Sequence, residues 1–335
     1  MKSMTLGLDL AKDTFHLVDH NGKRKKLRRS QMLKHFGNLP ASHIAMEACG
    51  GAHYWSRELQ KLGHTTSLLP PQHVKPYARG QKNDYNDAQA ILECCQHGKV
   101  RTVATKGIEQ QDHQSLLRMR ALVVSEQTRL CAQIRSLLGE YGIVMPQGKA
   151  SVKRRLPEIL DDTTNQLTPL MRELLQRQYH RLLFILDELT WYDQQMAQQA
   201  KQDDDCRRLQ ELPGFGPVNS YATKAWMGDG LQFQRGRHAS AALGVVPRQH
   251  TSGDKVKLSG ITKRGDSYVR SLVIHGARAV VSHAGKKNDP LSRWIQRLVE
   301  TRGFNKAVVA LANKLIRMAW VILSRKEHYR PAVAV

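Results

Sequence analysis

The sequence has few acidic residues for its many basic ones. Aspartate and glutamate number 29 against 52 lysines and arginines, which gives a formal net charge of +23. Such an imbalance predicts a polyanionic partner, either nucleic acid or an acidic membrane surface. Acids that stand beside apolar runs in so basic a chain therefore need an explanation other than solubility.

Cysteine is also scarce. The five cysteines are scattered along the chain, and none belongs to a Cys-x-x-Cys pair. This spacing excludes a disulfide framework and a zinc ribbon, and it is typical of a protein of the reducing cytoplasm.

Long uninterrupted apolar runs are missing. The first apolar run contains Asp9, unlike the core of a signal peptide, and the most apolar stretch, Lys306–Leu323, is interrupted by Lys314 and Arg317. We expect an amphipathic helix there and no membrane partner. The sequence also lacks a Gly-x-x-x-x-Gly-Lys-Ser/Thr loop, so no ATP-binding P-loop is expected.

Positive charge gathers at the two ends of the chain. Residues 1–100 hold 15 basic and 8 acidic side chains, residues 101–205 hold 14 of each, and residues 206–335 hold 23 and 7. These charges are spread through segments that look folded, instead of forming one basic amphipathic helix, which favours nucleic acid over a membrane surface. The polyanion is expected mainly on the C-terminal third.

The first hundred residues alternate between strand and helix patterns. Runs at 4–10, 14–19 and 23–29 predict three strands, with Asn21-Gly22 as a hairpin turn. Three strands joined by hairpins and then alternating helices and strands match the ribonuclease H-like fold. The basic third strand is either a solvated sheet edge or a strand that tracks phosphates. The later elements are strands at 43–46 and 65–69 and helices around 31–36, 54–62 and 87–97.

Four acids fall where these elements end or begin. Asp9 and Glu47 each follow an apolar strand pattern, and Asp84 and Asp87 stand three residues apart at the start of a helix, where they share a face. Each acid alone is explained as a surface residue, or as a cap or first-turn acid favoured by the helix dipole. As a set from three elements, they predict one acidic site.

The neutral middle of the chain predicts two long helices. The first covers residues 113–141, and in the second Leu175, Leu182, Leu189 and Met196 repeat every seven residues. This heptad seam fits either an intramolecular helical hairpin or a dimer. Residues 145–168, which contain Pro146 and Pro157, predict a loop or bent linker.

The last third offers two candidate contact sites for phosphate. Gly214 and Gly216, in Leu-Pro-Gly-Phe-Gly-Pro, predict either a helix-hairpin-helix whose N–H groups approach a phosphate or a tight helix connection. After a short helix at 237–243, Ser252 precedes Gly253 in a glycine-flanked loop. It is bracketed by Arg248 and His250 on one side and by Lys263 and Arg264 on the other.

An exposed hydroxyl among cations is the setting that a serine attacking phosphorus requires, although Ser-Gly in a basic loop is also a common turn. A further helix is expected to open after Ile261–Asp266 and to continue through Val281.

Five motifs, taken in order, resemble the DEDD insertion-sequence transposases related to the Piv invertase, whose members are guided by a bridge RNA and recombine DNA through a serine. The resemblance covers nearly the whole chain. The motifs are Gly-Leu-Asp9-Leu-Ala-Lys, Met-Glu47-Ala-Cys-Gly-Gly, Lys82-Asn-Asp84-Tyr-Asn-Asp87-Ala, Leu-Pro-Gly-Phe-Gly and Gly-Val-Val-Pro-Arg-Gln-His-Thr-Ser252-Gly.

The resemblance implies an α/β N-terminal ribonuclease H-like (RuvC-like) domain at 1–105, a central helical coiled coil at 106–205 and a mostly α C-terminal transposase domain at 206–335. It implies target and donor DNA, a noncoding guide RNA and a homo-oligomer, dimer or tetramer, acting on the bacterial nucleoid. Asp9, Glu47, Asp84 and Asp87 would hold Mg²⁺ or Mn²⁺, and Ser252, ahead of Ser240 and Ser259, would be the nucleophile.

Two other functions remain compatible with the residues. One is a metal-dependent, structure-selective nuclease such as a Holliday-junction resolvase, in which water attacks the phosphate. The other is a catalytically silent nucleic-acid-binding protein. Four grouped acids argue against the second, because they would only weaken the binding of a polyanion.

Overall fold

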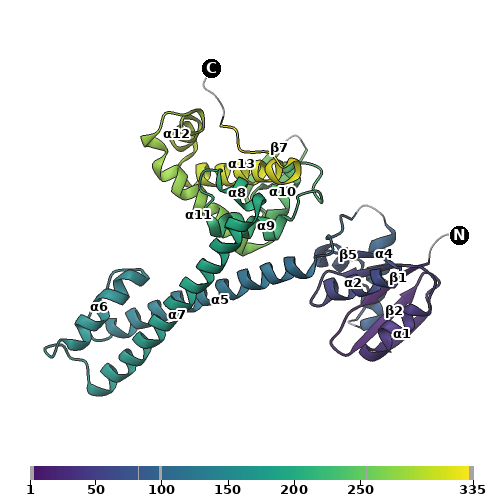
Figure 1. The fold of residues 1–335 in the computed structure, drawn as a ribbon, viewed down its shortest axis with the longest axis horizontal. Coiled ribbons are helices and arrows are strands. Elements are labelled where there is room, and N and C mark those ends of the chain that lie inside the picture. Colours follow the sequence, from purple (N-terminus) through teal and green to yellow (C-terminus); the bar gives the residue numbers. More distant parts are fainter. Residues whose placement is uncertain (1–3, 82, 98–99, 254, 332–335) are drawn as a thin grey trace. The chain divides into compact units, whose positions relative to one another are not determined.

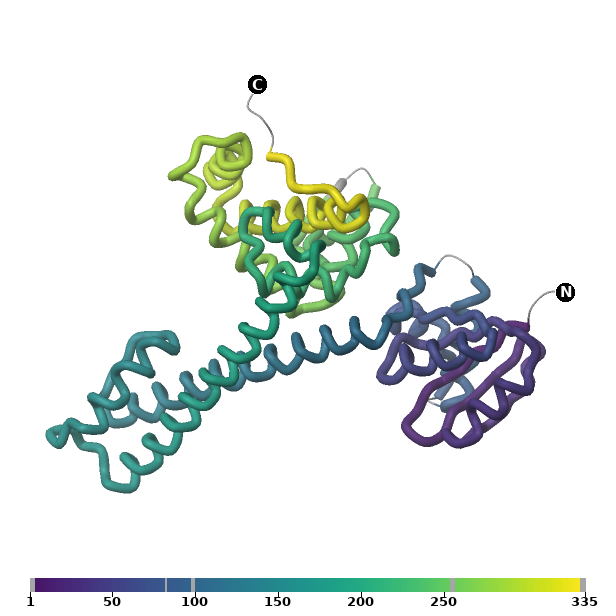
Figure 2. Tube along the Cα trace, viewed as in Figure 1, coloured from purple at the N-terminus to yellow at the C-terminus, as the bar shows by residue number. Residues whose placement is uncertain are grey.

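The computed structural model describes residues 4–81, 83–97, 100–253 and 255–331. The chain divides into two compact units, Met1–Glu109 and Gln110–Val335, and each is described by itself (Figures 1 and 2). The predicted three-domain division, with boundaries after residues 105 and 205, stays a prediction.

The first unit is built on one five-stranded mixed sheet. Its strand order is β3-β2-β1-β4-β5, with β1 antiparallel to β2 and parallel to β4. The predicted α/β class is confirmed, and the arrangement fits a RuvC-like domain. The elements are β1 (Thr5–Asp9), β2 (Thr14–Asp19), β3 (Arg24–Arg28), α1 (Met32–Gly37), β4 (His43–Glu47), α2 (Ala52–Lys61), β5 (Thr65–Leu69), α3 (Pro71–Val74) and α4 (Asp84–Gln96), with short 3₁₀ turns at Arg29–Gln31 and Lys75–Tyr77.

Alternate residues of the strands serve the two faces of the sheet. Leu8 and Phe15 face one side, where they pack with Trp55 of α2. Val18 faces the other side and packs against Ala88 of α4. The basic strand β3 lies at the edge of the sheet. This position agrees with its interpretation as a solvated sheet edge.

The second unit begins with a long helical hairpin. Helix α5 (Ile108–Gly139) and helix α7 (Pro169–Gln202) enclose a core with α6 (Lys149–Asp161). The heptad residues Leu175, Leu182 and Leu189 are buried in this core. The seam is therefore filled within the chain, as expected for an intramolecular hairpin.

The prediction of a loop over residues 145–168 is wrong, because α6 occupies most of it. Pro157 lies inside this helix, where its missing N–H leaves the carbonyl of Lys153 without its usual donor. The hydroxyl of Tyr179 on α7 donates to that carbonyl at 3.2 Å. A tertiary contact thus replaces the lost hydrogen bond, and the burial of Val152 and Leu156 stabilises the helix.

The rest of the second unit is mostly helical and shares one core around α13 (Phe304–Arg325). By length and composition α13 is apolar enough to cross a membrane, but half of its most apolar window is buried inside the protein. We therefore describe α13 as a core helix. Its neighbours are α8 (Asp204–Gln210), α9 (Pro217–Met227), α10 (Gly236–Leu243), α11 (Ser267–His283), a 3₁₀ turn (Ala284–Lys286) and α12 (Pro290–Arg302).

The two glycines between α8 and α9 have different surroundings. Gly214 has φ +79°, and a Cβ there would lie 2.5 Å from the carbonyl oxygen of Gly276 on α11. A Cβ on Gly276 would lie 2.2 Å from the carbonyl oxygen of Gly214. Gly214 is thus explained by close backbone packing. Gly216, in contrast, is exposed with open space around its Cα.

The prediction of a loop over residues 244–253 is also wrong for its second half. Residues Pro247–Ser252 form strand β6, which pairs with β7 (Lys255–Ile261) in an antiparallel hairpin. The register shifts between Pro247 and Gln249. All six residues of β6 are exposed, so the apolar alternation that identifies a half-buried strand is absent.

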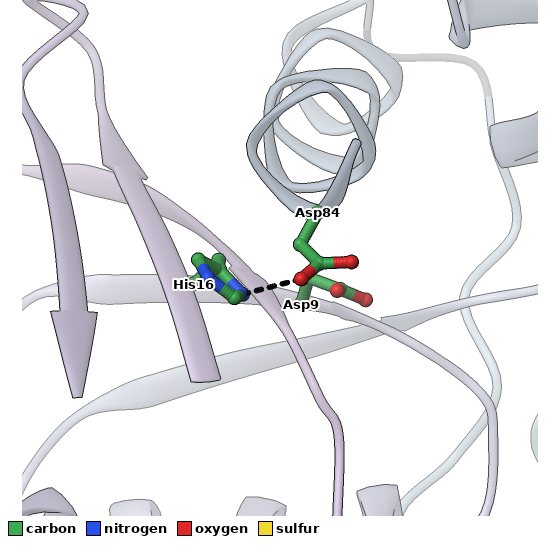
Figure 3. A group of neighbouring side chains, drawn as sticks. All are labelled: Asp9, His16 and Asp84. Atoms are coloured by element: carbon green, nitrogen blue, oxygen red, sulfur yellow. Dashed lines mark ion pairs between the residues drawn. The ribbon is translucent and has the colours of Figure 1, made fainter. Parts of the chain in front are cut away.

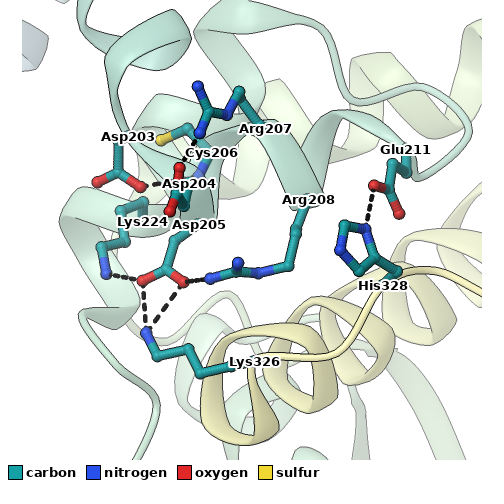
Figure 4. A network of polar contacts seen from close by, with 10 residues as sticks. All are labelled: Asp203, Asp204, Asp205, Cys206, Arg207, Arg208, Glu211, Lys224, Lys326 and His328. Atoms are coloured by element: carbon teal, nitrogen blue, oxygen red, sulfur yellow. Dashed lines mark hydrogen bonds and ion pairs between the residues drawn. The ribbon is translucent and has the colours of Figure 1, made fainter.

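A buried carboxylate connects the C-terminal segment to α8 and α9 (Figure 4). Asp205 is 6% exposed and pairs with Arg208, Lys224 and Lys326, the last at 2.7 Å. Burial alone would raise the pKa of Asp205, but the hydrogen bonds from Lys224, Lys326 and Arg208 outweigh it and lower that pKa to about 2. Nearby, Glu211 accepts from His328 and from the backbone N–H of Tyr329.

We predict that Asp205→Asn lowers the free energy of unfolding at pH 7 by about 3 kcal/mol, because three cations lose a buried partner. Asp204→Asn is the matched control. Its exposed pair with Arg207 contributes less than about 1 kcal/mol. Urea unfolding measures both values.

The effect of pH has a definite sign, because the native pKa of Asp205 lies below its ordinary value. The ion pairs stabilise fully above about pH 4, and this contribution falls as the pH drops toward 2. The difference between wild type and Asp205→Asn should shrink over that range. A difference that stays constant down to pH 3 would contradict the assignment.

Candidate metal centre

Two of the four acids end neighbouring parallel strands. Asp9 is the last residue of β1, and Glu47 is the last residue of β4. Leu8 of β1 is paired with Met46 of β4, so the two acids leave the same end of the sheet next to each other. Both side chains are half-buried.

The other two acids belong to the first turn of α4. Asn83 caps this helix, and its side chain accepts a hydrogen bond from the N–H of Tyr85 at 2.9 Å. Asp84 and Asp87 follow within the first turn, Asp84 exposed and Asp87 half-buried. Both acids were expected at the start of this helix, although the predicted range of 87–97 begins three residues later than the observed helix.

Close packing of α4 on β1 brings these two pairs together. A Cβ on Gly7 would lie 2.2 Å from the carbonyl oxygen of Ala88 and 2.8 Å from Cβ of Leu92. Only glycine at this position lets the helix backbone approach the strand so closely. The contact joins Gly7, two residues before Asp9, to Ala88, one residue after Asp87.

A histidine that the sequence did not reveal joins the site (Figure 3). His16 on β2 lies directly opposite Asp9 in the antiparallel pair. Its Nδ1 is 3.4 Å from an oxygen of Asp84 and has no hydrogen-bond partner. Ligand atoms of Asp9, His16 and Asp84 all lie within 4.8 Å of one another. The ring of Tyr85 packs edge-on against His16, with centroids 4.7 Å apart.

The acids repel one another in the absence of a cation. Burial, together with the charges of Asp87, Asp84 and Glu47, raises the pKa of Asp9 to about 6. Burial and the charge of Asp87 also raise the pKa of Glu47. The same site raises the pKa of the Cys49 thiol, through burial and the charges of Glu47 and Asp9, so this thiol stays protonated. Carboxylate oxygens are therefore the available anionic ligands.

This donor set suits a hard divalent cation. Mg²⁺ and Mn²⁺ prefer oxygen ligands, and imidazole is acceptable to Mn²⁺. The structure brings the four predicted acids into one electrostatically coupled group. Their assignment as metal ligands stays a prediction.

The remaining predicted residues belong to the second unit. Ser252 is exposed at the end of β6, and Arg248 is exposed on the same strand. Lys263 and Arg264 are exposed in the turn between β7 and α11. The roles of these residues, and those of Gly214 and Gly216, in binding nucleic acid are likewise still predictions.

The turn that carries Lys263 and Arg264 is held by its backbone. A Cβ on Gly244 would lie 2.3 Å from the backbone nitrogen of Arg264, and a Cβ on Gly265 would lie 2.0 Å from the carbonyl oxygen of Ala242. The guanidinium of Arg270 donates to the carbonyl of Arg264 at 2.7 Å. The two cations are thus presented to solvent from a fixed turn.

The chain matches two family models and several curated proteins. Residues 206–292 match the model described as Transposase IS116/IS110/IS902 family, and residues 6–143 match a DEDD model of the IS110 group described as Transposase. The transposase for insertion sequence element IS1111A of Coxiella burnetii is 43% identical over 97% of this chain and 91% of its own length. The chain belongs to the IS116/IS110/IS902 family of transposases.

Two further relatives agree with this family. A probable family 20 transposase of Pseudomonas aeruginosa is 43% identical over 99% of this chain and all of its own. The pilin gene-inverting protein of Moraxella lacunata is 21% identical over 98% of both chains. A transposase of this family cuts and transfers DNA strands, and DEDD transposase domains normally use a divalent metal.

We predict that Gly7→Ala damages the acidic site of this transposase through the position of α4. The new methyl group forces helix and strand apart, at a cost of about 1–3 kcal/mol in unfolding free energy. Separating the two pairs of acids should also weaken Mg²⁺ or Mn²⁺ binding in calorimetric titrations. Gly37→Ala is the matched control, because its Cβ meets only Leu62 at 4.0 Å. Equal behaviour of both variants would refute this role of Gly7.

Proposed function

We propose that this transposase joins DNA strands through a covalent serine intermediate, with Mg²⁺ or Mn²⁺ held by Asp9, Glu47, Asp84 and Asp87. The observation that carries the metal part is the convergence of four mutually repelling carboxylates from three elements, with Nδ1 of His16 unpartnered beside them. A bound cation would polarise the scissile phosphate and stabilise the leaving oxygen.

The chain's own side chains position that cation. Asp9 and Glu47 are carried on strand ends, and Asp84 and Asp87 on a capped helix turn, so the ligands are fixed by the fold before the metal arrives. His16 is buried and its Nδ1 lies 3.4 Å from an oxygen of Asp84, whose own side chain is exposed.

Ser252 is the proposed nucleophile. Its Oγ forms a bond to phosphorus as the bond to the 3′ oxygen breaks, the serine proton leaves, and the 3′ oxygen ends as a hydroxyl. The phosphoserine link is then reversed by the 3′ hydroxyl of the partner strand. One phosphodiester is exchanged for another in each step, so no ATP is required.

Exposure supports Ser252 over one of its two rivals. Ser240 is 1% exposed inside α10, and its hydroxyl donates to the carbonyl of Gly236 at 3.2 Å. Ser259 on β7 is exposed, like Ser252, so the position of the adduct must decide between these two serines. Arg248, exposed on the same strand β6, supplies positive charge near Ser252, and His250 is also exposed on that strand.

We expect Ser252→Ala and Asp87→Asn each to abolish a protein–DNA adduct that the wild type forms. The substrate is a labelled, nicked DNA carrying the ends of the insertion element, incubated with Mg²⁺ and stopped with detergent. Peptide mass spectrometry locates the nucleotide on its serine. An adduct that survives Ser252→Ala would refute the nucleophile. Cleavage without any adduct would favour the alternative, a nuclease that uses water.

The same assay tests for an oligomer with shared sites. Leu170, Leu174, Phe184 and Trp191 are exposed along one side of α7, away from its buried heptad seam, which supports contact with a second copy. If the acids and the serine that act on one phosphate come from two protomers, mixing Asp87→Asn with Ser252→Ala restores part of the adduct. Mixed assemblies that form without rescue would confine the site to one chain.

We also propose that a noncoding bridge RNA guides target and donor choice by base pairing. The excess of positive charge in the C-terminal third, 23 basic against 7 acidic residues, supports a second polyanion beside DNA. Protein expressed together with the DNA that flanks its reading frame should co-purify one RNA transcribed from that flank. Recovery of unselected cellular RNA alone would contradict guidance.

A further inference from the structure

A basic cleft in the second unit is lined by two tryptophans. It has a volume of about 730 Å³ and lies between α10, α12 and α13. Its walls carry four cations and no acid. The cations are Arg235, Arg237, Lys314 and Arg317, and the two tryptophans are Trp294 and Trp320.

The four cations have no acidic partner among the described residues, because none of their side chains takes part in an ion pair there. All four are exposed. Nζ of Lys314 lies 4.9 Å from the centroid of Trp294, and this ring partly compensates its charge. A concave site with this much uncompensated charge fits an anion with several phosphates.

The walls of the cleft are held by hydrogen bonds and close packing. The indole N–H of Trp320 donates to the carbonyls of Gly230 and Phe233, both at 3.0 Å. A Cβ on Gly236 would lie 3.1 Å from the carbonyl oxygen of Arg317, so α10 packs with its backbone against α13. This packing sets Arg235 and Arg237, the residues on either side of Gly236, next to Arg317.

A second cleft, of about 870 Å³, continues the first along α13. The two share Ala310 and Asn313, and the second is walled by Leu258, Ser259 and Gly260 of β7. It adds two more cations, Arg302 and Lys306, and again no acid. The residues of α13 that line the two clefts recur every three or four positions, so one face of the helix forms the floor of a continuous groove.

We propose that this groove binds a single DNA strand, with phosphates on Arg235, Arg237 and Arg317 and one unpaired base against Trp294. The groove leads to the β6–β7 hairpin that bears Ser252. A base is able to enter only if it is unpaired, and Lys314 then exchanges the ring of Trp294 for a phosphate. The choice of DNA as the polymer rests on the proposed strand transfer. The binding of phosphates by the cations and of a base by Trp294 does not depend on that proposal.

Full-length protein is titrated against fluorescein-labelled oligothymidylate of about 15 nucleotides, by anisotropy, in EDTA so that no cleavage occurs. Trp294→Leu keeps an apolar side chain in the core and should weaken binding about 5- to 150-fold without changing the salt dependence. Arg237→Gln combined with Arg317→Gln should lower the slope of log affinity against log salt by about 1.4. Thermal melting confirms that the variants are folded.

Arg293→Gln is the matched control, because Arg293 is an exposed residue of α12 next to Trp294 that does not line the groove. It should leave binding nearly unchanged. Equal losses for this control and the groove variants would overturn the site, as would an unchanged affinity of Trp294→Leu. Tighter binding of oligouridylate or of duplex DNA of the same length would overturn the assignment to a single DNA strand. None of these results depends on whether Ser252 is the nucleophile.

Discussion

Repulsion between carboxylates is the constraint around which the first unit is organised. Asp9 has its pKa raised to about 6 because burial and three further acids surround it. A fold gains no stability from such a group without a cation, so the close packing that creates it must be held by other contacts. Those contacts are apolar: Val18, Ala88 and Leu92 are buried where α4 covers the sheet.

The second unit contains an excess of positive charge in its C-terminal part, where 23 basic side chains face 7 acidic ones. Around Asp205 the positive charge is partly compensated, because one buried acid pairs with three cations. On the α13 groove the cations are left without acids. Charge that stabilises the fold and charge that is open to a ligand are therefore separated in space.

Much of the first unit was predictable from sequence. Apolar runs and an Asn-Gly turn predicted the strands and a hairpin turn, and acids at strand ends and at a helix start predicted the acidic group. His16 was not found, because its pattern is that of an ordinary strand residue. Only the hairpin register, which pairs it with Asp9, reveals it. The sequence likewise gives no reason for a glycine at position 7. The nearby carbonyl of Ala88 on α4, which leaves no room for a Cβ, supplies that reason.

The failures in the second unit share a physical cause. Pro157 is typical of a helix end. The hydroxyl of Tyr179 that compensates for its missing N–H lies 22 residues further along the chain, so a local sequence pattern does not predict this contact. Strand β6 has no buried face, so it shows no alternation. The groove is lined by residues spread from 235 to 321, so local sequence pattern does not reveal it. The periodicity of α13 alone indicates only an amphipathic helix.

The contact between Gly214, at the α8–α9 turn, and Gly276, on α11, constrains which substitutions this protein tolerates. Gly214 and Gly276 each exclude a side chain because the backbone of the other is in the way. A substitution at either one must separate the same two segments, so the second substitution meets space that the first has already opened. The two positions are therefore coupled, and the loss from replacing both should be smaller than the sum of the separate losses.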